Sequence, residues 1–299
     1  MERILNYTIS AADEGMIVLD FLRKQGFSRH ILTAMKADRE ALSLNGQKAG
    51  GRTVLSCGDH FRVRLLETVP ADGILPTPLN IPVLYEDEDI LVINKPADMP
   101  VHPSIGNYEN TLANGIAWYF AEKGEDFVYR CINRLDRDTT GALILAKNPL
   151  SAAILSVQMK KRQILRTYLA LVDGLLPDSG TINAPIARME GSVITREVNF
   201  GTGESAITHY ERLAAGKEYS LAELHLETGR THQIRVHMKY IGHPLPGDYL
   251  YNPDYRRINR QPLHSYQLEF THPTTGKVML FTAPLPIDFI SAFYSNPLK

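Results

Sequence analysis

The 299-residue sequence has few of the features that build disulfide-linked, membrane-spanning or secreted proteins. Its two cysteines, Cys57 and Cys131, cannot form a disulfide framework or a four-thiolate zinc site, and they suit a reducing compartment. Apolar runs such as Ala142–Ala146 are far shorter than the roughly 20 residues that span a bilayer. The first ten residues, MERILNYTIS, lack the apolar core of a signal peptide. We therefore expect a cytoplasmic protein with no membrane partner.

The chain also has almost no net charge, because its 32 basic and 33 acidic residues leave a formal net charge of −1 at pH 7. The general basic excess of many nucleic-acid-binding proteins is absent, so any anion site must come from local clustering. What the chain does contain is apolar material. Hydrophobic residues make up 44% of it, enough for a large packed core. Its length allows one large domain or two unequal ones.

Residues 1–66 are predicted to form a small α+β module. Apolar spacing predicts a helix on either side of Ser28, which is a candidate N-cap for the second. The pair Asn45-Gly46 follows a short alternating run and predicts a hairpin turn, and residues 61–65 alternate like a strand. Ten basic residues against seven acidic ones give the module a weak positive excess.

The rest of the chain is predicted to be a linker followed by one larger domain. Residues 67–82 contain four prolines and no periodicity, which is typical of a linker because proline cannot donate ladder hydrogen bonds. Residues 83–299 contain more strands than helices and few strand–helix–strand units, so we expect an α+β fold with a mainly antiparallel mixed sheet and flanking helices. The predicted strands are 83–85, 90–93, 142–147, 169–172, 206–213 and 220–227, and the predicted helices are 111–120, 150–161 and 231–241.

The first segment with catalytic potential is the polar loop Ile132–Gly141, which leads into a predicted buried strand. Asp136 lies between Arg134 and Arg137, whose charges favour the carboxylate form and keep it ready as a nucleophile or base. A loop that leads into a rigid core strand can hold a reactive side chain in place. The structural alternative, in which Asp136 and Thr139 only bond backbone groups in a turn, is equally open.

The second segment, Leu226–His237, places the end of a predicted strand directly before a predicted helix. Unpaired N–H groups at a helix start, together with Arg230 and His232, favour a phosphate site. Arg235 is placed to reach inward to a carboxylate. The alternative is an amphipathic helix whose charges face solvent. His232 and His237 are five residues apart rather than four, so we expect no zinc site.

Two basic clusters, Lys160–Arg166 and Arg256–Arg260, are candidates for gripping a phosphate backbone, although such charges usually form solvated faces. Tyr168, which opens a predicted strand, is either ordinary core or an aromatic that stacks on a base. The string GTGESA at 201–206 fits a dinucleotide-binding fingerprint. The residues after it alternate like a strand where that motif requires a helix, so we reject this reading.

Taken together, these segments resemble the large-subunit (RluA-type) pseudouridine synthase family across nearly the whole chain. The residues 1–66 are similar, more loosely, to the small RNA-binding module of ribosomal proteins. Asn133, Thr140 and Asp98 depart from the family pattern, where His, Ser and Gly are usual. The strings that carry the resemblance are Tyr85-Glu86-Asp87, Asn94-Lys95-Pro96, Met99-Pro100-Val101-His102-Pro103, Arg134-Leu135-Asp136, Thr139-Thr140-Gly141, Tyr168-Leu169-Ala170, Gly174, TGRTHQIRVH at 228–237, Gly242-His243-Pro244 and Gly247-Asp248.

The resemblance implies an isomerase that converts uridine in structured RNA, ribosomal or transfer, to pseudouridine without cofactor or metal. The uridine would be flipped into a pocket. Asp136 would be the essential carboxylate, which adds to the sugar or the base or removes a sugar proton, with Arg235 as its partner. Tyr168 would stack on the base and help to remove its final proton, and Arg134 would fill the gap in the RNA. The further substrate-binding candidates are Arg230, His232 and Thr139. We expect a monomer.

Two other functions stay open from the sequence. A non-catalytic RNA-binding or ribosome-assembly protein on the same scaffold would have no use for Asp136, since a carboxylate repels a phosphate backbone. A nucleoside hydrolase would release free uracil. No residue chooses the RNA or the uridine position.

Overall fold

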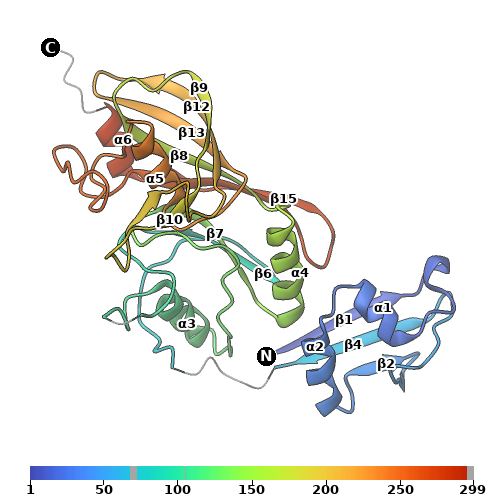
Figure 1. Cartoon of the computed structure of the whole chain (residues 1–299). Coiled ribbons are helices and arrows are strands. Elements are labelled where there is room, and N and C mark those ends of the chain that lie inside the picture. Colours follow the sequence, from blue (N-terminus) through green and yellow to red (C-terminus); the bar gives the residue numbers. More distant parts are fainter. Residues whose placement is uncertain (68–72, 105, 295–299) are drawn as a thin grey trace.

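The computed structural model describes residues 1–67, 73–104 and 106–294. A four-stranded sheet near the N-terminus and a nine-stranded sheet in the large domain dominate the described chain (Figure 1). The smaller sheet lies within residues 1–66, which we call the module, and the larger one lies within residues 83–299.

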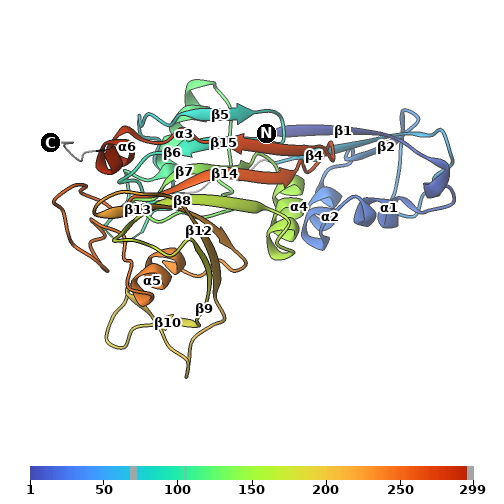
Figure 2. The same cartoon turned by 90° about the horizontal axis from the view of Figure 1, so that it is seen from above.

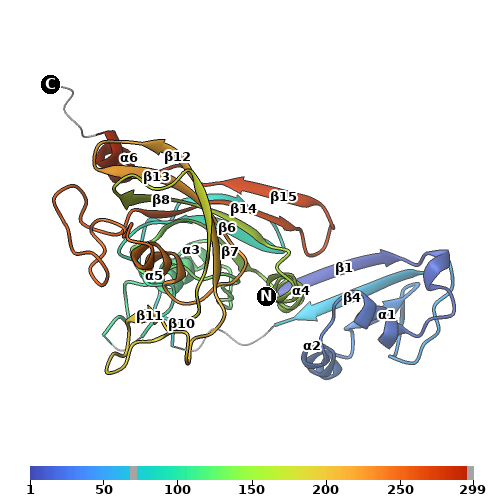
Figure 3. The same ribbon diagram turned by 45° about the horizontal axis from the view of Figure 1, so that its top comes forward.

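Two helices cover one face of the module's sheet, whose strand order is β1-β4-β2-β3 (Figure 3). The Ser28 hydroxyl accepts a hydrogen bond from the backbone N–H of Ile31 at 3.3 Å, and Asn45 and Gly46 have positive φ angles of 50° and 79°. The predicted helix cap and hairpin are therefore confirmed, whereas the first strand was not predicted. The module's elements are β1 (Glu2–Thr8), α1 (Val18–Lys24), α2 (Arg29–Ala34), β2 (Leu42–Leu44), β3 (Gln47–Lys48) and β4 (His60–Leu66), with 3-10 turns at Ala11–Asp13 and Met35–Ala37.

The nine-stranded sheet has the order β5-β6-β7-β14-β8-β13-β12-β9, with β15 paired to β14. Every pairing in it is antiparallel except that between β7 and β14, which confirms the predicted α+β class and mainly antiparallel sheet. Its strands, together with the separate hairpin β10–β11, are β5 (Val83–Glu86), β6 (Ile90–Lys95), β7 (Thr140–Ala146), β8 (Leu165–Asp173), β9 (Ser179–Asn183), β10 (Ile186–Arg188), β11 (Arg196–Val198), β12 (Ile207–Ala215), β13 (Tyr219–Leu226), β14 (Leu263–Thr271) and β15 (Val278–Thr282).

Helices cover both faces of this sheet, as the alternation along β8 shows. Tyr168 and Ala170 belong to the core under α3 (Leu112–Glu122) and α5 (Gln233–Tyr240), whereas Leu169 and Leu171 pack with α6 (Ile287–Tyr294). Figure 2 shows α5 and α6 on opposite sides of β8 and β13. The longest helix in the described ranges, α4 (Pro149–Lys160), has 12 residues. No helix in these ranges is long and apolar enough to cross a bilayer.

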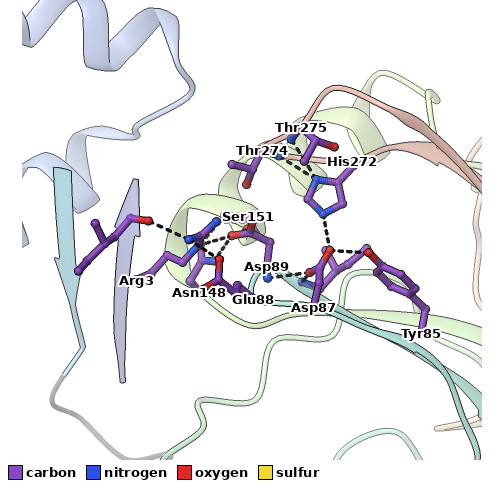
Figure 4. Close-up of polar contacts among 12 residues, drawn as sticks. Arg3, Tyr85, Asp87, Glu88, Asp89, Asn148, Ser151, His272, Thr274 and Thr275 are labelled. Atoms are coloured by element: carbon purple, nitrogen blue, oxygen red, sulfur yellow. Dashed lines mark hydrogen bonds and ion pairs between the residues drawn. The ribbon is translucent and has the colours of Figure 1, made fainter. Parts of the chain in front are cut away.

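The module packs against α4 and the turn between β5 and β6. Arg3 of β1 forms a bidentate pair with Asp89 at 3.0 and 2.9 Å, and Figure 4 shows its side chain reaching across from the module. Leu150 of α4 is buried within the module's own core. A Cβ at Gly26 would lie 2.7 Å from a side-chain carbon of Ile154, so the missing side chain lets α4 approach this closely.

Asp87, Asp89 and His272 also lie close together, with one ligand atom of each within 4.8 Å of the others (Figure 4). Their atoms are engaged by protein hydrogen bonds. His272 Nε2 lies 2.8 Å from Asp87, and Asp89 accepts from Arg3 and Asn148. This polar network links the β5–β6 turn to the end of β14 on one side and to the module on the other.

Candidate active site

Asp136 lies in the loop before β7, and hydrogen bonds to its backbone carbonyls hold this loop in place. The N–H of Thr139 donates to the carbonyl of Asp136 at 3.1 Å and closes a turn. The carbonyl of Arg137 accepts from Lys95 Nζ at 2.7 Å, and the next carbonyl accepts from Arg260 Nη1 at 3.1 Å. The backbone at Asp136 and directly after it is thus fixed by these hydrogen bonds.

Arg235 reaches Asp136 from the first turn of α5. Its Nη1 donates to Oδ2 of Asp136 at 2.8 Å, across 99 positions of sequence. The Arg235 side chain is 1% exposed, and that of Asp136 is 26% exposed. Oδ1 of Asp136 has no hydrogen-bond partner among the described residues. The expected contact is therefore present, and it leaves one carboxylate oxygen available.

A single cavity of about 80 Å³ is lined by every site residue proposed from the sequence. Leu226, Ile234 and Leu263 supply apolar walls. Within the described chain the hydroxyl of Thr139 is buried with no partner, and so is Nε of Arg166, which lines the same cavity. The proposed residues gathered here are Arg134, Asp136, Thr139, Tyr168, Arg230, His232 and Arg235.

This cavity adjoins a much larger cleft of about 1210 Å³, with which it shares Arg134, Asp136 and Arg166. The cleft extends to the end of α4 and the start of β8, where Lys160 and Arg162 line it. The first basic cluster predicted from the sequence therefore lies along the approach to Asp136. Such a lining attracts a phosphate backbone.

The second basic cluster is neutralised by acidic partners. Each of its three arginines pairs with a carboxylate, and Arg260 is also largely buried. The pairs are Arg256 with Asp254 at 2.6 Å, Arg257 with Glu218 at 3.2 Å and Arg260 with Asp288 at 2.7 Å. These side chains hold the surrounding loops together, and they do not form an open patch for phosphate.

The helix that was predicted over residues 231–241 begins later, at Gln233. His232 precedes it with φ of 59°, in the left-handed region, and does not cap it. The Gln233 side chain accepts from the N–H of Arg230 at 2.9 Å and from Thr228 at 2.8 Å. The Arg230 guanidinium pairs with Glu204. The backbone and side-chain donors of Arg230 thus have protein partners, which weakens the predicted phosphate site there.

The two histidines of this segment point to different places. Nε2 of His232 lies 4.0 Å from Oδ2 of Asp136, and burial lowers the pKa of His232. His237 is fully buried and bonds Thr208 at 2.9 Å and the carbonyl of Ala184 at 2.8 Å. Only His232 therefore belongs to the cavity.

The three departures from the family pattern fit their surroundings to different degrees, and the buried Nδ2 of Asn133 has no partner among the described residues. Asn133 Oδ1 accepts from the N–H of Ile144 at 2.9 Å, and the Thr140 hydroxyl lies 2.7 Å from Nδ1 of His264. Asp98 has φ of 53°, in the region where glycine is favoured, which accounts for the usual glycine at this position.

Three residues of the site were not identified individually from the sequence. Asp248 holds Arg235 from the side opposite Asp136, Lys95 holds the loop that carries Asp136, and Arg166 lines both cavities. All three lie inside strings or clusters that the sequence singled out. A string, however, does not show which of its side chains meets which atom.

The chain is similar in sequence and in structure to proteins of one known family. The family model described as RNA pseudouridylate synthase matches residues 89–240. The chain is 40% identical over 274 residues to the uncharacterized RNA pseudouridine synthase YjbO of Bacillus subtilis, covering 91% of this chain and 96% of that protein. It is 40% identical over 252 residues to the ribosomal large subunit pseudouridine synthase D of Zymomonas mobilis, covering 76% and 78%. The solved structure of human RNA pseudouridylate synthase domain containing 1 is similar, with a TM-score of 0.57, 27% identity and coverage of 73% and 96%.

Proposed function

This chain belongs to the RluA-type RNA pseudouridine synthase family, and on that premise we propose that Asp136 is the carboxylate on which its reaction depends. The chain is an isomerase that converts uridine in RNA to pseudouridine. In this conversion the bond between N1 of uracil and the ribose breaks, and C5 bonds to the ribose in its place. C5 loses a proton and N1 gains one, so the atoms balance without a co-reactant.

The pairing of Asp136 with Arg235 is the observation that carries the proposal. The guanidinium orients the carboxylate through a charge-assisted hydrogen bond. The unpartnered oxygen then acts on the nucleotide at the bottom of the cleft. Apolar walls keep water away from the detached base, which would otherwise be lost to hydrolysis.

The other residues of the cavity are assigned supporting roles. Tyr168, buried in β8, stacks on the flipped base and helps to remove its C5 proton. The unpartnered hydroxyl of Thr139 hydrogen-bonds the base. Arg134 is exposed where the cavity meets the cleft, and it fills the gap that the flipped base leaves. Arg230 and His232 line the same cavity as Tyr168 and are assigned as substrate contacts.

Replacing Asp136 by Asn tests this assignment, because the amide keeps the shape of the side chain and loses its charge. We expect tritium release from RNA labelled at uridine C5 to fall by about 10⁴-fold or more, as removal of a reacting group does, with RNA affinity nearly unchanged. Asp98→Asn is the matched control, since it removes an 86% exposed carboxylate from the neighbouring loop. Equal turnover by wild type and the Asp136 variant would exclude Asp136 as the catalyst.

The same assay separates the other two functions. A non-catalytic RNA-binding protein would release no tritium, and a nucleoside hydrolase would yield free uracil without pseudouridine. Accumulation of free uracil from RNA by the wild-type protein would contradict the proposed isomerisation.

For the substrate, we propose ribosomal RNA, supported by the name of the Zymomonas relative and by the basic cleft, with the module as a second RNA contact. Transfer RNA is the competing substrate. Mapping pseudouridine in both RNAs, in cells that lack the protein and in cells that carry only Asp136→Asn, distinguishes them. A site lost from transfer RNA alone would overturn the choice. A cytosolic monomer stays our prediction.

A further inference from the structure

The guanidinium of Arg235 is held between two carboxylates rather than by Asp136 alone. One edge of it, formed by Nε and Nη2, donates to both oxygens of Asp248 at 2.7 and 2.8 Å. Of the remaining N–H groups, which lie on Nη1 and Nη2, only one on Nη1 donates to Asp136, at 2.8 Å. Asp248 is completely buried, so this second pair is the better shielded of the two.

Asp248 is itself anchored independently of Asp136. Its Oδ1 accepts from the N–H groups of Leu250 at 3.0 Å and Tyr251 at 3.2 Å. Gly247, directly before it, has φ of 69°, and a Cβ there would lie 2.5 Å from the carbonyl oxygen of Ile258. The turn that carries Asp248 is thus tightly packed, and the carboxylate has one position in it.

Tyr251 completes the support of Arg235. Its ring centroid lies 5.0 Å from the guanidinium carbon, in the geometry of a cation–π contact. Its hydroxyl accepts from the N–H of Arg196 at 2.9 Å and lies 2.9 Å from Nδ1 of His232. The Tyr251 hydroxyl thus connects the backbone of Arg196 to His232, whose Nε2 lies 4.0 Å from Oδ2 of Asp136.

We propose that Asp248 is a positioning residue: it fixes the Arg235 guanidinium by its Nε–Nη2 edge, so that Nη1 alone meets Oδ2 of Asp136 and Oδ1 of Asp136 stays free to react. An arginine that meets a single carboxylate commonly binds both of its oxygens. Such a grip would engage both oxygens of Asp136 and neutralise its charge. With Asp248 on the other edge, the three side chains together keep one negative charge at the cavity. This inference rests on the proposed role of Asp136.

The test is Asp248→Asn, which keeps the side-chain shape and loses the charge that balances Arg235. We expect kcat to fall by about 10- to 100-fold, as for outer partners that orient an active-site group, while KM and RNA affinity stay unchanged. Asp254→Asn is the control, because it removes a surface acid–arginine pair from the same loop. A raised KM with wild-type kcat, or wild-type behaviour in both, would overturn the inference.

A double-mutant cycle with Arg235→Lys shows whether Asp248 acts through Arg235. A lysine has no bidentate edge, so adding Asp248→Asn to it should cost less than about 3-fold further in kcat. Independent roles would multiply the two losses, and that result would overturn the proposal. If Asp248→Asn is not recovered folded, Asp248→Glu is measured instead. Its longer carboxylate displaces the guanidinium, so kcat should fall at constant KM, and a wild-type kcat would contradict us.

The outcomes separate this inference from the proposed function. An active Asp136→Asn variant removes the function and with it the inference. An inactive Asp136→Asn variant beside a wild-type Asp248→Asn variant removes the inference alone.

Discussion

At the scale of single residues, Lys95 holds the loop that carries Asp136 through three hydrogen bonds. It is completely buried, and its Nζ donates to the carbonyl oxygens of Pro96, Met99 and Arg137 at 2.7, 2.8 and 2.7 Å. One of these acceptors is the residue next to Asp136. Burial lowers the pKa of Lys95 from 10.5 to about 7. One amine thus links the strand β6 to the loop that carries the proposed catalyst.

Replacing Lys95 by Met should destabilise the fold by about 2 kcal/mol or more at pH 7, because buried carbonyls lose their donor. The pKa of Lys95 is lower in the folded chain than in the unfolded chain, so the unfolded chain binds more protons between pH 7 and 10.5. The free energy of unfolding therefore rises with pH in this range. The slope of the unfolding free energy against pH that Lys95 contributes reaches about 1.4 kcal/mol per pH unit, and this contribution should vanish in the Lys95→Met variant. Urea unfolding at pH 7 to 9.5 measures both effects, with the exposed Lys36→Met as control. An unchanged slope would show that Lys95 does not titrate in this window.

At the scale of elements, the parallel pair β7–β14 is the one place where the sheet departs from antiparallel order. Gly141 of β7 pairs with Ser265 of β14, and its φ is 110°. A Cβ at Gly141 would lie 2.3 Å from the carbonyl oxygen of Ser265. Because Gly141 has no side chain, β14 can lie against β7, the strand that follows the loop of Asp136.

Gly141→Ala should cost about 3 kcal/mol or more of unfolding free energy, since the backbone conformation and the close contact are both violated. Gly191→Ala is the control. Its φ is 74°, but no atom lies within 4 Å of its added carbon, so it should lose only about 1 kcal/mol. Chemical denaturation of the two variants gives the comparison. Equal losses would mean that strain alone, and not the contact with β14, requires glycine.

At the scale of the whole molecule, the module is fixed to the large domain by a buried ion pair and an apolar contact. Arg3 is 16% and Asp89 5% exposed at the side chain, and Leu150 and Ile154 of α4 pack on the module's core. The relative position of the module and Asp136 is thus set by contacts as well as by the chain between them. An RNA that touches both surfaces would have to match this spacing.

Arg3→Met should weaken the contact between the module and α4, because it leaves the carboxylate of Asp89 buried without its cation. The contact should lose about 3 kcal/mol of stability. Faster hydrogen exchange of the amides of β1 and α4 is the expected result. Arg23→Met is the control, since its partner Asp20 lies on the module's own surface. Unchanged hydrogen exchange in α4 would show that the apolar contact alone is enough to hold the module against the large domain. Deleting residues 1–66 is a less clean experiment, because it exposes Leu150.

Local pattern predicted part of the elements, because alternation, caps and turns depend on neighbouring residues. In the large domain it missed six of them, β9, β10, β11, β14, β15 and α6. Ser28 caps α2, Asn45 begins the β2–β3 turn, and β12 follows GTGESA as predicted. The strand β1 was missed, since it is completed by β4, whose residues lie more than fifty positions later. The loop and helix strings of the site were also recognisable, since each is contiguous.

The contacts between distant segments are what only the tertiary structure decided. That Arg235 meets Asp136 was expected, but the second carboxylate on its other edge was not, because Asp248 belongs to another string. Likewise, the sequence shows Arg260 only as part of a basic cluster, whereas in the folded chain it pairs with Asp288. Sequence determines which side chains are available and how each short segment folds. Packing decides which charges are paired, which are buried, and so which oxygen of Asp136 has no protein partner.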